Sequence, residues 1–420
     1  MSAAGATSAR SVEHLLRDLT PQVLGALTRR HRDFAAAEDA VQEALLDASM
    51  QWPLEGVPQN PGGWLYKAAL RRFTDQVRSD VARRRREEAL ANEMADDEMY
   101  ATDDLYEPEQ DDTLMLLFMC AHPSLTPANA IPLMLRAVGG LTTREIGAAL
   151  LVSEATLAQR ISRAKQTIAE SKGTFELPSA EERAQRLDAV LHVLYLIFNE
   201  GYASSSGERL QRVDLSGEAI RLARALNASV VDAPEVTGLL ALMLLTDARR
   251  AARTDAAGEL IPLDEQDRAL WDPALIQEGI ALIGSAMAQG QIGSYQLQAA
   301  IAAIHDQAES TESADWAQIH AFYLLLERTN EGNPMITLNR AVALAMVEGP
   351  EAGLQVVDEV EKDGRMKGHY RVHAVRGHLY ERKGEREKAV EEYRLAAETT
   401  ASVPERNYLV RKAARLATSR

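Results

Sequence analysis

Hydrophobic side chains recur along most of this chain at intervals of three and four residues, which is the spacing of a helix that buries one face. In the segment 154–170 the buried stripe would consist of Leu157, Ile161, Ala164 and Ile168. Ala, Leu, Glu and Arg dominate the composition, and no alternation of Val, Ile and Thr typical of strands persists. The pattern therefore predicts an all-α protein.

The segment 140–165, GLTTREIGAALLVSEATLAQRISRAK, predicts two short helices joined by a turn, a helix-turn-helix. Thr142 and Glu145 have the spacing of a capping box, and Ser153 can cap the second helix. Outside its buried stripe the second helix carries Glu154, Thr156, Gln159, Arg160, Arg163 and Gln166. Such side chains suit base edges and phosphates in a major groove, so we favour DNA binding over ordinary helix packing.

Residues 12–50 predict two helices, and the second of them, 35–50, has an acidic face. That face carries Glu38, Asp39, Gln42, Glu43 and Asp47. Composition alone favours a solvated surface there. The segment 52–63 predicts a loop, because three prolines remove backbone donors and three glycines permit unusual dihedral angles.

A long basic helix is predicted for 64–91, ending in the run Arg83 to Arg86. Trp64, Tyr66 and Phe73 are interleaved with its positive charges, so the helix could hold a nucleic-acid backbone while aromatic rings stack on bases. A charged helix end is an equally good interpretation.

Residues 96–111 are strongly acidic and lack apolar periodicity, which predicts a flexible linker. This linker would separate a first helical domain, 10–95, from a second, 112–173, that contains the helix-turn-helix. The order of parts is basic helix, acidic tether and DNA-binding helix.

These parts together resemble an RNA polymerase sigma factor of the extracytoplasmic-function type. The resemblance covers 10–172 and is carried by AAAEDAVQEALLDA (35–48), NPGGWLYKAALRRFTDQVR (60–78) and the helix-turn-helix. It implies that the first domain binds core polymerase and the promoter −10 element, and that the second binds the −35 element.

The resemblance also implies roles for individual residues. The coiled coil of the largest polymerase subunit would be met by Glu38, Asp39, Gln42 and Glu43. The loop 56–63 would receive a flipped base of the −10 element, which would be contacted by Asn60, Trp64, Lys67, Arg71, Arg72, Asp75 and Arg78. The −35 element would be contacted by Ser153, Thr156, Gln159, Arg160, Arg163 and Lys165.

Residues 180–420 predict a tetratricopeptide-like solenoid. The repeat spacing is clearest at Gly377, Tyr380, Ala389, Tyr393 and Ala396. Weaker copies occur at Ala341, Leu344, Gly353, Val357 and Val360, and at Ala219, Ala223 and Leu226. Solenoids usually bind peptides or proteins, and a subgroup of sigma factors with such an extension implies a regulatory domain, with a regulatory protein or peptide as its partner.

The remaining features limit the function classes. The net charge of −16 requires any DNA contact to come from local basic surfaces, and the single cysteine, Cys120, is expected to be a small buried side chain. We find no catalytic or phosphate-binding motif, and we expect neither an enzyme nor a cofactor. His369 and His373 lack a third ligand at useful spacing, so we expect no metal. The segment 198–215 is predicted to be a surface loop. Without a signal peptide or a bilayer-spanning run, we expect a cytoplasmic protein that does not contact membranes.

Two other functions remain open at this stage. One is a helix-turn-helix regulator whose solenoid senses a ligand or peptide and which never joins polymerase. The other is a solenoid scaffold with a vestigial N-terminal half. The basic, Trp-containing helix behind a Pro/Gly loop argues against the plain regulator, which has no use for it.

Overall fold

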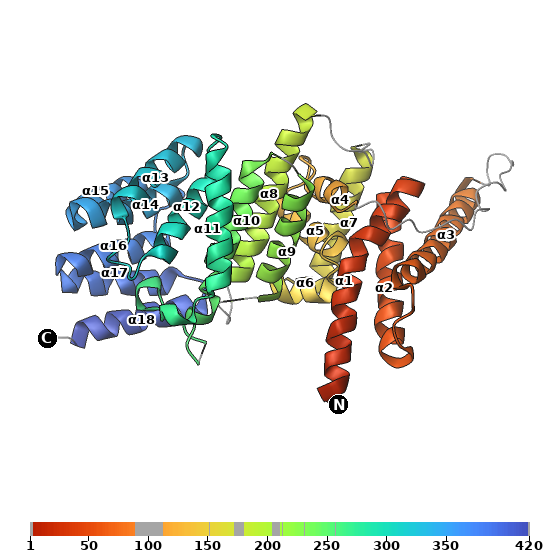
Figure 1. Ribbon diagram of the computed structural model, residues 1–420, viewed down its shortest axis with the longest axis horizontal. Helices are drawn as coiled ribbons and strands as arrows, with labels where there is room; N and C mark the ends of the chain where they lie inside the picture. Colours follow the sequence, from red (N-terminus) through yellow and green to blue (C-terminus); the bar gives the residue numbers. More distant parts are fainter. Residues whose placement is uncertain are drawn as a thin grey trace. The chain divides into compact units, whose positions relative to one another are not determined.

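The computed structural model is helical throughout the part of the chain that it describes, and it contains no strand there (Figure 1). An isolated bridge joins Thr254 and Leu260. The prediction of an all-α fold is confirmed. The described residues are 3–88, 112–150, 152–171, 180–203, 211, 213–230, 232–256 and 258–418. The acidic segment 96–111, expected to be a linker, lies outside them.

The described helices divide into two compact units, Met1–Leu196 and Ile197–Arg420, and the boundary falls within α8 (Ala180–Tyr202). The first unit opens with α1 (Ala3–His31), α2 (Phe34–Glu55) and α3 (Pro61–Glu88). Asp33 begins α2 by accepting a hydrogen bond from the Ala36 N–H. Trp52 of α2 packs edge-on against Trp64 of α3 at 5.5 Å between ring centroids. These three helices bury their apolar stripes against one another.

The predicted loop over 52–63 is too long. Helix α2 continues through Pro53 to Glu55, and α3 already begins at Pro61, which leaves 56–60 as the connection. Pro53 lies in the last turn of α2, where its missing N–H removes a single hydrogen bond. Pro61 occupies the first turn of α3, where a proline costs the helix nothing.

The rest of the first unit contains α4 (Thr113–Cys120), α5 (Pro127–Ala137), α6 (Thr143–Leu150) and α7 (Glu154–Glu170). Cys120 in α4 is fully buried, as expected, and burial raises the pKa of its thiol. The segment predicted to be a helix-turn-helix forms α6 and α7, and both predicted caps are present. The Thr142 N–H donates to Glu145 Oε2 at 2.7 Å, and Ser153 Oγ accepts from the Thr156 N–H at 3.2 Å.

The second unit is a succession of antiparallel helix pairs after α9 (Val213–Ser229) and α10 (Pro234–Ala248). The helices that follow are α11 (Pro273–Ala288), α12 (Ser294–Gln307), α13 (Trp316–Thr329), α14 (Pro334–Glu348), α15 (Pro350–Glu361), α16 (Tyr370–Lys383), α17 (Arg386–Thr399) and α18 (Val403–Thr418).

Small residues allow the last helix pairs to pack closely. A Cβ on Gly377 of α16 would lie 2.9 Å from the Tyr393 ring of α17, and one on Gly353 of α15 would lie 2.7 Å from the Ala341 carbonyl oxygen of α14. Ala389, Tyr393 and Ala396 are buried in one cluster, with Tyr380 packed against it. Gly353, Gly377 and this cluster, which belong to the repeat pattern in the sequence, thus lie between neighbouring helices.

The predicted surface loop over 198–215 is wrong at both ends. Residues up to Tyr202 belong to α8, and α9 begins at Val213. Phe198 is buried and stacks on Tyr202 at 5.7 Å. Gly201 is a packing residue, since a Cβ there would lie 2.3 Å from the Ser216 backbone nitrogen.

The second unit also contains a buried group of charged and aromatic side chains around Asp306. The carboxylate of Asp306 has no exposed surface and lies 3.5 Å from Arg249 Nε. His305, next to it, packs edge-on against Trp316 at 5.2 Å. Burial is the largest cause of two pKa shifts here: it raises the pKa of Asp306 to about 6 and lowers the pKa of His305 to about 4.

The two shifts oppose each other in the pH dependence of stability. Protonated Asp306 stabilises the folded unit below about pH 3.8, and this contribution is lost as pH rises through about 6. Neutral His305 stabilises it above about pH 6.5, and that contribution is lost as pH falls through about 4.

Asp306→Asn should therefore make the stability of the second unit more pH-dependent. With the carboxyl removed, only the His305 contribution remains, and it increases stability as pH rises. From pH 4.5 to pH 6.5 the free energy of unfolding should therefore increase more in the variant than in the unmodified chain, by on the order of 1–2 kcal/mol. Urea unfolding at the two pH values measures this difference. Parallel pH profiles for the two chains would contradict it.

Candidate nucleic-acid interface

Helix α7 has the construction expected of a DNA recognition helix. Its buried stripe is Leu157, Ile161, Ala164 and Ile168, as predicted from the spacing. Ser153 begins the helix, and its hydroxyl also lies 2.8 Å from Thr156 Oγ1. The apolar stripe fixes the helix against its own domain, which leaves the opposite face for a ligand.

The six side chains expected at the −35 element do not share one surface. Ser153, Thr156, Gln159 and Arg163 are exposed, and Arg160 is half-buried. Lys165 is buried at 8% exposure, and its Nζ lies 2.6 Å from Asp39 Oδ1 and 3.0 Å from Glu38 Oε2. Lys165 therefore faces α2 in this conformation, while the other five remain on or near the surface of α7.

The side chains expected at the −10 element lie along α3 and at its start. Lys67, Arg71, Arg72, Asp75 and Arg78 are exposed, and Trp64 is half-buried. Asn60 begins the helix, because its Oδ1 accepts a hydrogen bond from the Gly63 N–H at 2.9 Å. The side chains of Arg83 to Arg86 lie outside the described residues.

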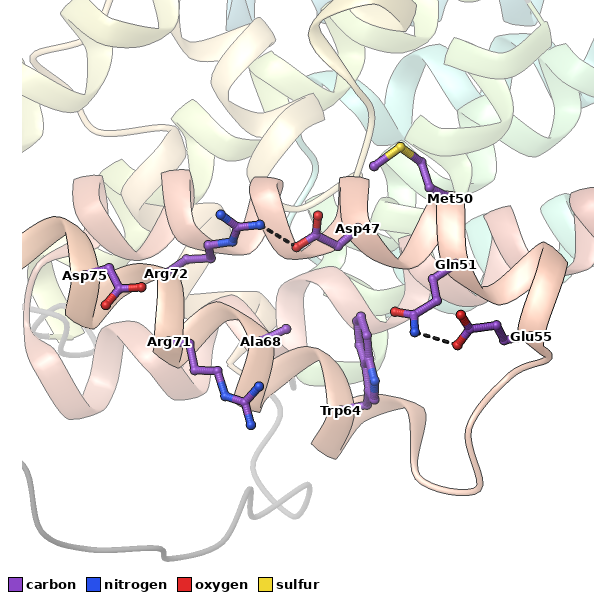
Figure 2. A pocket seen from close by; sticks show the side chains of 9 residues that line it. All are labelled: Asp47, Met50, Gln51, Glu55, Trp64, Ala68, Arg71, Arg72 and Asp75. Atoms are coloured by element: carbon purple, nitrogen blue, oxygen red, sulfur yellow. Dashed lines mark hydrogen bonds and ion pairs between the residues drawn. The ribbon is translucent and has the colours of Figure 1, made fainter.

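A groove of about 560 Å³ runs between α2 and α3 (Figure 2). Its lining residues are Asp47, Met50, Gln51, Glu55, Trp64, Ala68, Arg71, Arg72 and Asp75. Figure 2 shows Arg72 directed at Asp47, with 2.9 Å between Nη2 and Oδ2, while Arg71 points to the other side of α3. The pKa of Arg72 is raised, and the hydrogen bond to Asp47 is the largest cause of this shift. The groove thus combines the Trp64 ring with two arginines: Arg72 is held by Asp47 of α2, and Arg71 has no ion-pair partner among the described residues.

The acidic face of α2 is only partly solvated. Glu38 has no exposed surface, and its carboxylate lies within ion-pair distance of Arg136 and Lys165, the Arg136 Nε to Oε1 distance being 2.5 Å. Asp39 is half-exposed, and Gln42 Nε2 donates to the Arg136 carbonyl oxygen at 3.4 Å. Glu43 remains exposed, 3.6 Å from Arg72 Nε.

Arg136 is the residue of this region that sequence analysis missed. It lies in the last turn of α5, 98 residues after Glu38, and also donates to Thr143 Oγ1 at 2.8 Å. A single arginine in the last turn of a helix usually interacts with the helix dipole, so no local pattern distinguishes it.

The histidines considered as metal ligands have structural partners. His369 begins α16 by accepting from the Arg371 N–H, and His373 Nδ1 lies 2.7 Å from Glu392 Oε2. Within the described ranges no group of three or more His, Cys, Asp or Glu is arranged to hold a metal ion. No helix described here has the length and apolarity needed to cross a bilayer.

Comparison with protein families identifies both N-terminal domains. Residues 15–84 match sigma-70 region 2, and residues 115–168 match sigma-70 region 4. The two matches support an RNA polymerase sigma factor, with a role in promoter-directed transcription initiation. We therefore call α1–α3 the region 2 domain and α4–α7 the region 4 domain.

The C-terminal part has a different relationship. Residues 186–287 match a family of unknown function, DUF6596. The chain is 43% identical over 370 residues to an uncharacterized protein of Rhizobium meliloti (strain 1021), covering 87% of this chain and 86% of that one. The chain belongs to the same family as that protein. No solved structure matches it.

Proposed function

We propose that this protein is a sigma factor of the extracytoplasmic-function type whose activity is controlled by its own C-terminal helical domain. One observation supports it above all: a capped recognition helix with an exposed polar face lies in a region 4 domain that follows a region 2 domain in the same chain. A plain helix-turn-helix regulator would not need the region 2 domain. Promoter DNA and core polymerase are the partners of this proposal.

In the proposed complex α7 enters the major groove at the −35 element. Ser153, Thr156, Gln159, Arg160 and Arg163 would supply contacts, and Lys165 could join them after leaving α2. Arg160 is the strongest candidate for a base contact, because it lies in the second turn of α7 and a guanidinium can bind a guanine edge bidentately.

Arg160→Ala should weaken binding to the preferred promoter by on the order of 1–3 kcal/mol, or about 5- to 150-fold. This loss is expected only for promoters that carry the base contacted by Arg160. The physical reason is the loss of a bidentate contact that other bases cannot accept. Binding of the polymerase complex to promoters with each base substituted in the −35 element measures it, with the exposed Arg394→Ala in α17 as control. An equal loss on every sequence would instead assign Arg160 to a phosphate.

The region 2 domain would act at the −10 element. Its connection 56–60 and the groove beside Trp64 could receive a base extruded from the opening duplex, since that base has already lost its stacking partners. Lys67, Arg71, Arg72 and Arg78 would hold the strand, with Asn60 fixing the start of α3 and Asp75 beside them. Glu38, Asp39, Gln42 and Glu43 on α2 would bind the coiled coil of the largest polymerase subunit.

The C-terminal helix pairs would form the regulatory domain. Their close packing at Gly353 and Gly377 is the packing that tetratricopeptide-like repeats require, and such repeats offer surfaces to peptides or proteins. We propose that this domain, with its bound protein or peptide, sets how readily the two sigma domains reach polymerase and promoter.

In vitro transcription with bacterial core polymerase on a promoter library tests the proposal, comparing the full chain with one ending at Lys172. Initiation at specific promoters by the full chain would support sigma activity. A change in activity on truncation, in either direction, would support control by the C-terminal domain. Failure of both forms to bind core polymerase or initiate would refute the sigma function.

A further inference from the structure

Two basic side chains of the region 4 domain hold two carboxylates of the region 2 domain. Arg136 of α5 and Lys165 of α7 meet Glu38 and Asp39 of α2, and we call these four residues the interdomain ion-pair cluster. Lys165 Nζ lies 3.0 Å from Glu38 Oε2 and 2.6 Å from Asp39 Oδ1, and Arg136 Nε lies 2.5 Å from Glu38 Oε1. Both oxygens of Glu38 are therefore paired.

Burial makes this contact specific. Glu38 is 0% exposed and Lys165 is 8% exposed, so each would be costly to leave without its partner in a low-dielectric contact. Separating the domains does not strand these charges, because each then returns to water. Opening the contact would therefore leave no buried charge without a partner.

The surrounding packing belongs to the same closed state. Gly140, before α6, approaches α1 so closely that a Cβ would lie 2.8 Å from Thr20 Oγ1 and 3.0 Å from Arg17 Cα, at a φ of +66° that also favours glycine. Arg17 pairs with Glu145 at 3.2 Å. Burial alone would raise the pKa of Glu145, but hydrogen bonds from Thr142 and the charge of Arg17 outweigh it and lower the pKa. The capping box that begins α6 is therefore also tied to α1.

We propose that the interdomain ion-pair cluster holds the free protein in a self-blocked state that core polymerase must open. This inference rests on the proposed function, in which Glu38 and Asp39 bind polymerase. A carboxylate with no exposed surface cannot contact a second protein while its own chain covers it. Arg136 and Lys165 occupy the positions that basic side chains of polymerase would take.

The same contact also ties DNA binding to polymerase binding. Lys165 is held on α2 in the closed state, so α7 presents its complete set of polar side chains only after opening. Polymerase binds the open state alone, and its binding energy shifts the population toward that state. One event then frees both the polymerase-binding carboxylates and a side chain of the recognition helix.

The first test changes the one cluster residue that is in neither proposed binding surface. Arg136→Glu places a negative charge against Glu38. Arg144→Glu, on the exposed start of α6, makes the same charge change in the groove that Asp39 and Arg136 line, but at a residue that forms no hydrogen bond or ion pair with the cluster. Spin labels on Met50→Cys in α2 and Glu170→Cys in α7 report the distance between domains, since both positions are exposed. Native Cys120 is fully buried and does not compete for the label.

We expect a short distance in the free full chain and in Arg144→Glu, and a longer one in Arg136→Glu or after addition of core polymerase. If about one molecule in ten is open at rest, Arg136→Glu should bind core about tenfold more tightly. Equal distance distributions for Arg136→Glu and Arg144→Glu would overturn the proposal. If Arg136→Glu opens but no form binds core, the self-contact is upheld and the proposed sigma function fails.

A second test needs no substitution and so does not depend on how a variant folds. A carbodiimide activates the Asp39 carboxyl, the Lys165 amine displaces the activating group as a urea, and an amide joins the two domains. Mass spectrometry should detect this cross-link alongside that of the exposed pair Lys362 and Glu359, 2.6 Å apart, which serves as the internal control.

The coupled sample is then captured on core polymerase. We expect the cross-linked Asp39–Lys165 peptide to remain in the unbound fraction. The cross-linked Lys362–Glu359 peptide should occur equally in the bound and unbound fractions. A missing Asp39–Lys165 cross-link with the control present, or equal division of both, would overturn the proposal. If nothing binds core in the unmodified sample, the proposed function fails while the cross-link still reports the closed state.

Discussion

Trp52→Ala should destabilise the region 2 domain by about 3–5 kcal/mol, the usual cost of truncating a buried tryptophan. Trp52 is 2% exposed and contacts Trp64 edge-on, so its removal leaves a cavity between α2 and α3 and loses an aromatic pair. This cost is a large part of the stability of a small domain. Hydrogen exchange of α2 and α3 peptides, measured against peptides of the second unit, gives the change.

Trp52→Phe is the matched control. The indole N–H of Trp52 has no hydrogen-bond partner within the described part of the chain, so its loss should cost nothing in hydrogen bonding. A phenyl ring keeps most of the buried area, and we expect a loss of only about 1–1.5 kcal/mol. If Trp52→Phe proved as damaging as Trp52→Ala, an interaction of the indole edge, and not cavity formation, would explain the effect.

The second large effect is expected in the C-terminal unit, at Gly353. A methyl group there would lie 2.7 Å from both the Ala341 carbonyl oxygen and the Ala345 Cβ, and neither can move without shifting α14. Gly353→Ala should therefore destabilise this unit by about 1–3 kcal/mol, in spite of the better helix propensity of alanine. Urea unfolding combined with hydrogen exchange of α14 and α15 measures it.

The same substitution in open space should have the opposite sign. Gly284 lies on the exposed side of α11 with no atom within 4 Å of an added Cβ. Gly284→Ala should stabilise the unit by about 0.5–1 kcal/mol, since alanine loses less backbone entropy in a helix. A destabilised Gly284→Ala, or a neutral Gly353→Ala, would show that backbone entropy and close packing are not the terms that decide here.

Local spacing was enough to predict the helix-turn-helix. Its caps at Thr142 and Ser153 and its stripe from Leu157 to Ile168 depend on residues three and four apart, so the information lies within one segment. The repeat pattern at Gly377 and Tyr393 was visible for a related reason, because an antiparallel pair of short helices brings nearby residues together.

Proline and glycine misled the prediction where tertiary packing decides their role. Pro53 was assigned to a loop, but buried Trp52 beside it anchors the last turn of α2, and Gly56 N–H still donates to the Trp52 carbonyl at 3.0 Å. The segment 198–215 was likewise predicted as a loop, although Gly201 within it is a close contact between α8 and α9. The type of a residue does not show which other residues it contacts in the folded protein.

The interdomain ion-pair cluster could not be predicted from the sequence. Glu38 and Lys165 are 127 residues apart, and each is assigned to a different binding surface when its own segment is considered. An acidic helix face is compatible with solvent, with polymerase or with another part of the chain. Only the tertiary structure shows that Glu38 is buried by its own protein.

In the proposed mechanism Glu38 meets its own chain in one state and polymerase in the next, so two different contacts would constrain its position during evolution. Arg136 is constrained by contacts within its own chain, chiefly with Glu38 and Thr143. Homologues that lose the acid at position 38 would leave the arginine at 136 without its counter-charge, so the two positions should vary together. A lineage that replaced both would give up self-blocking and would depend on a separate protein to keep its sigma factor silent.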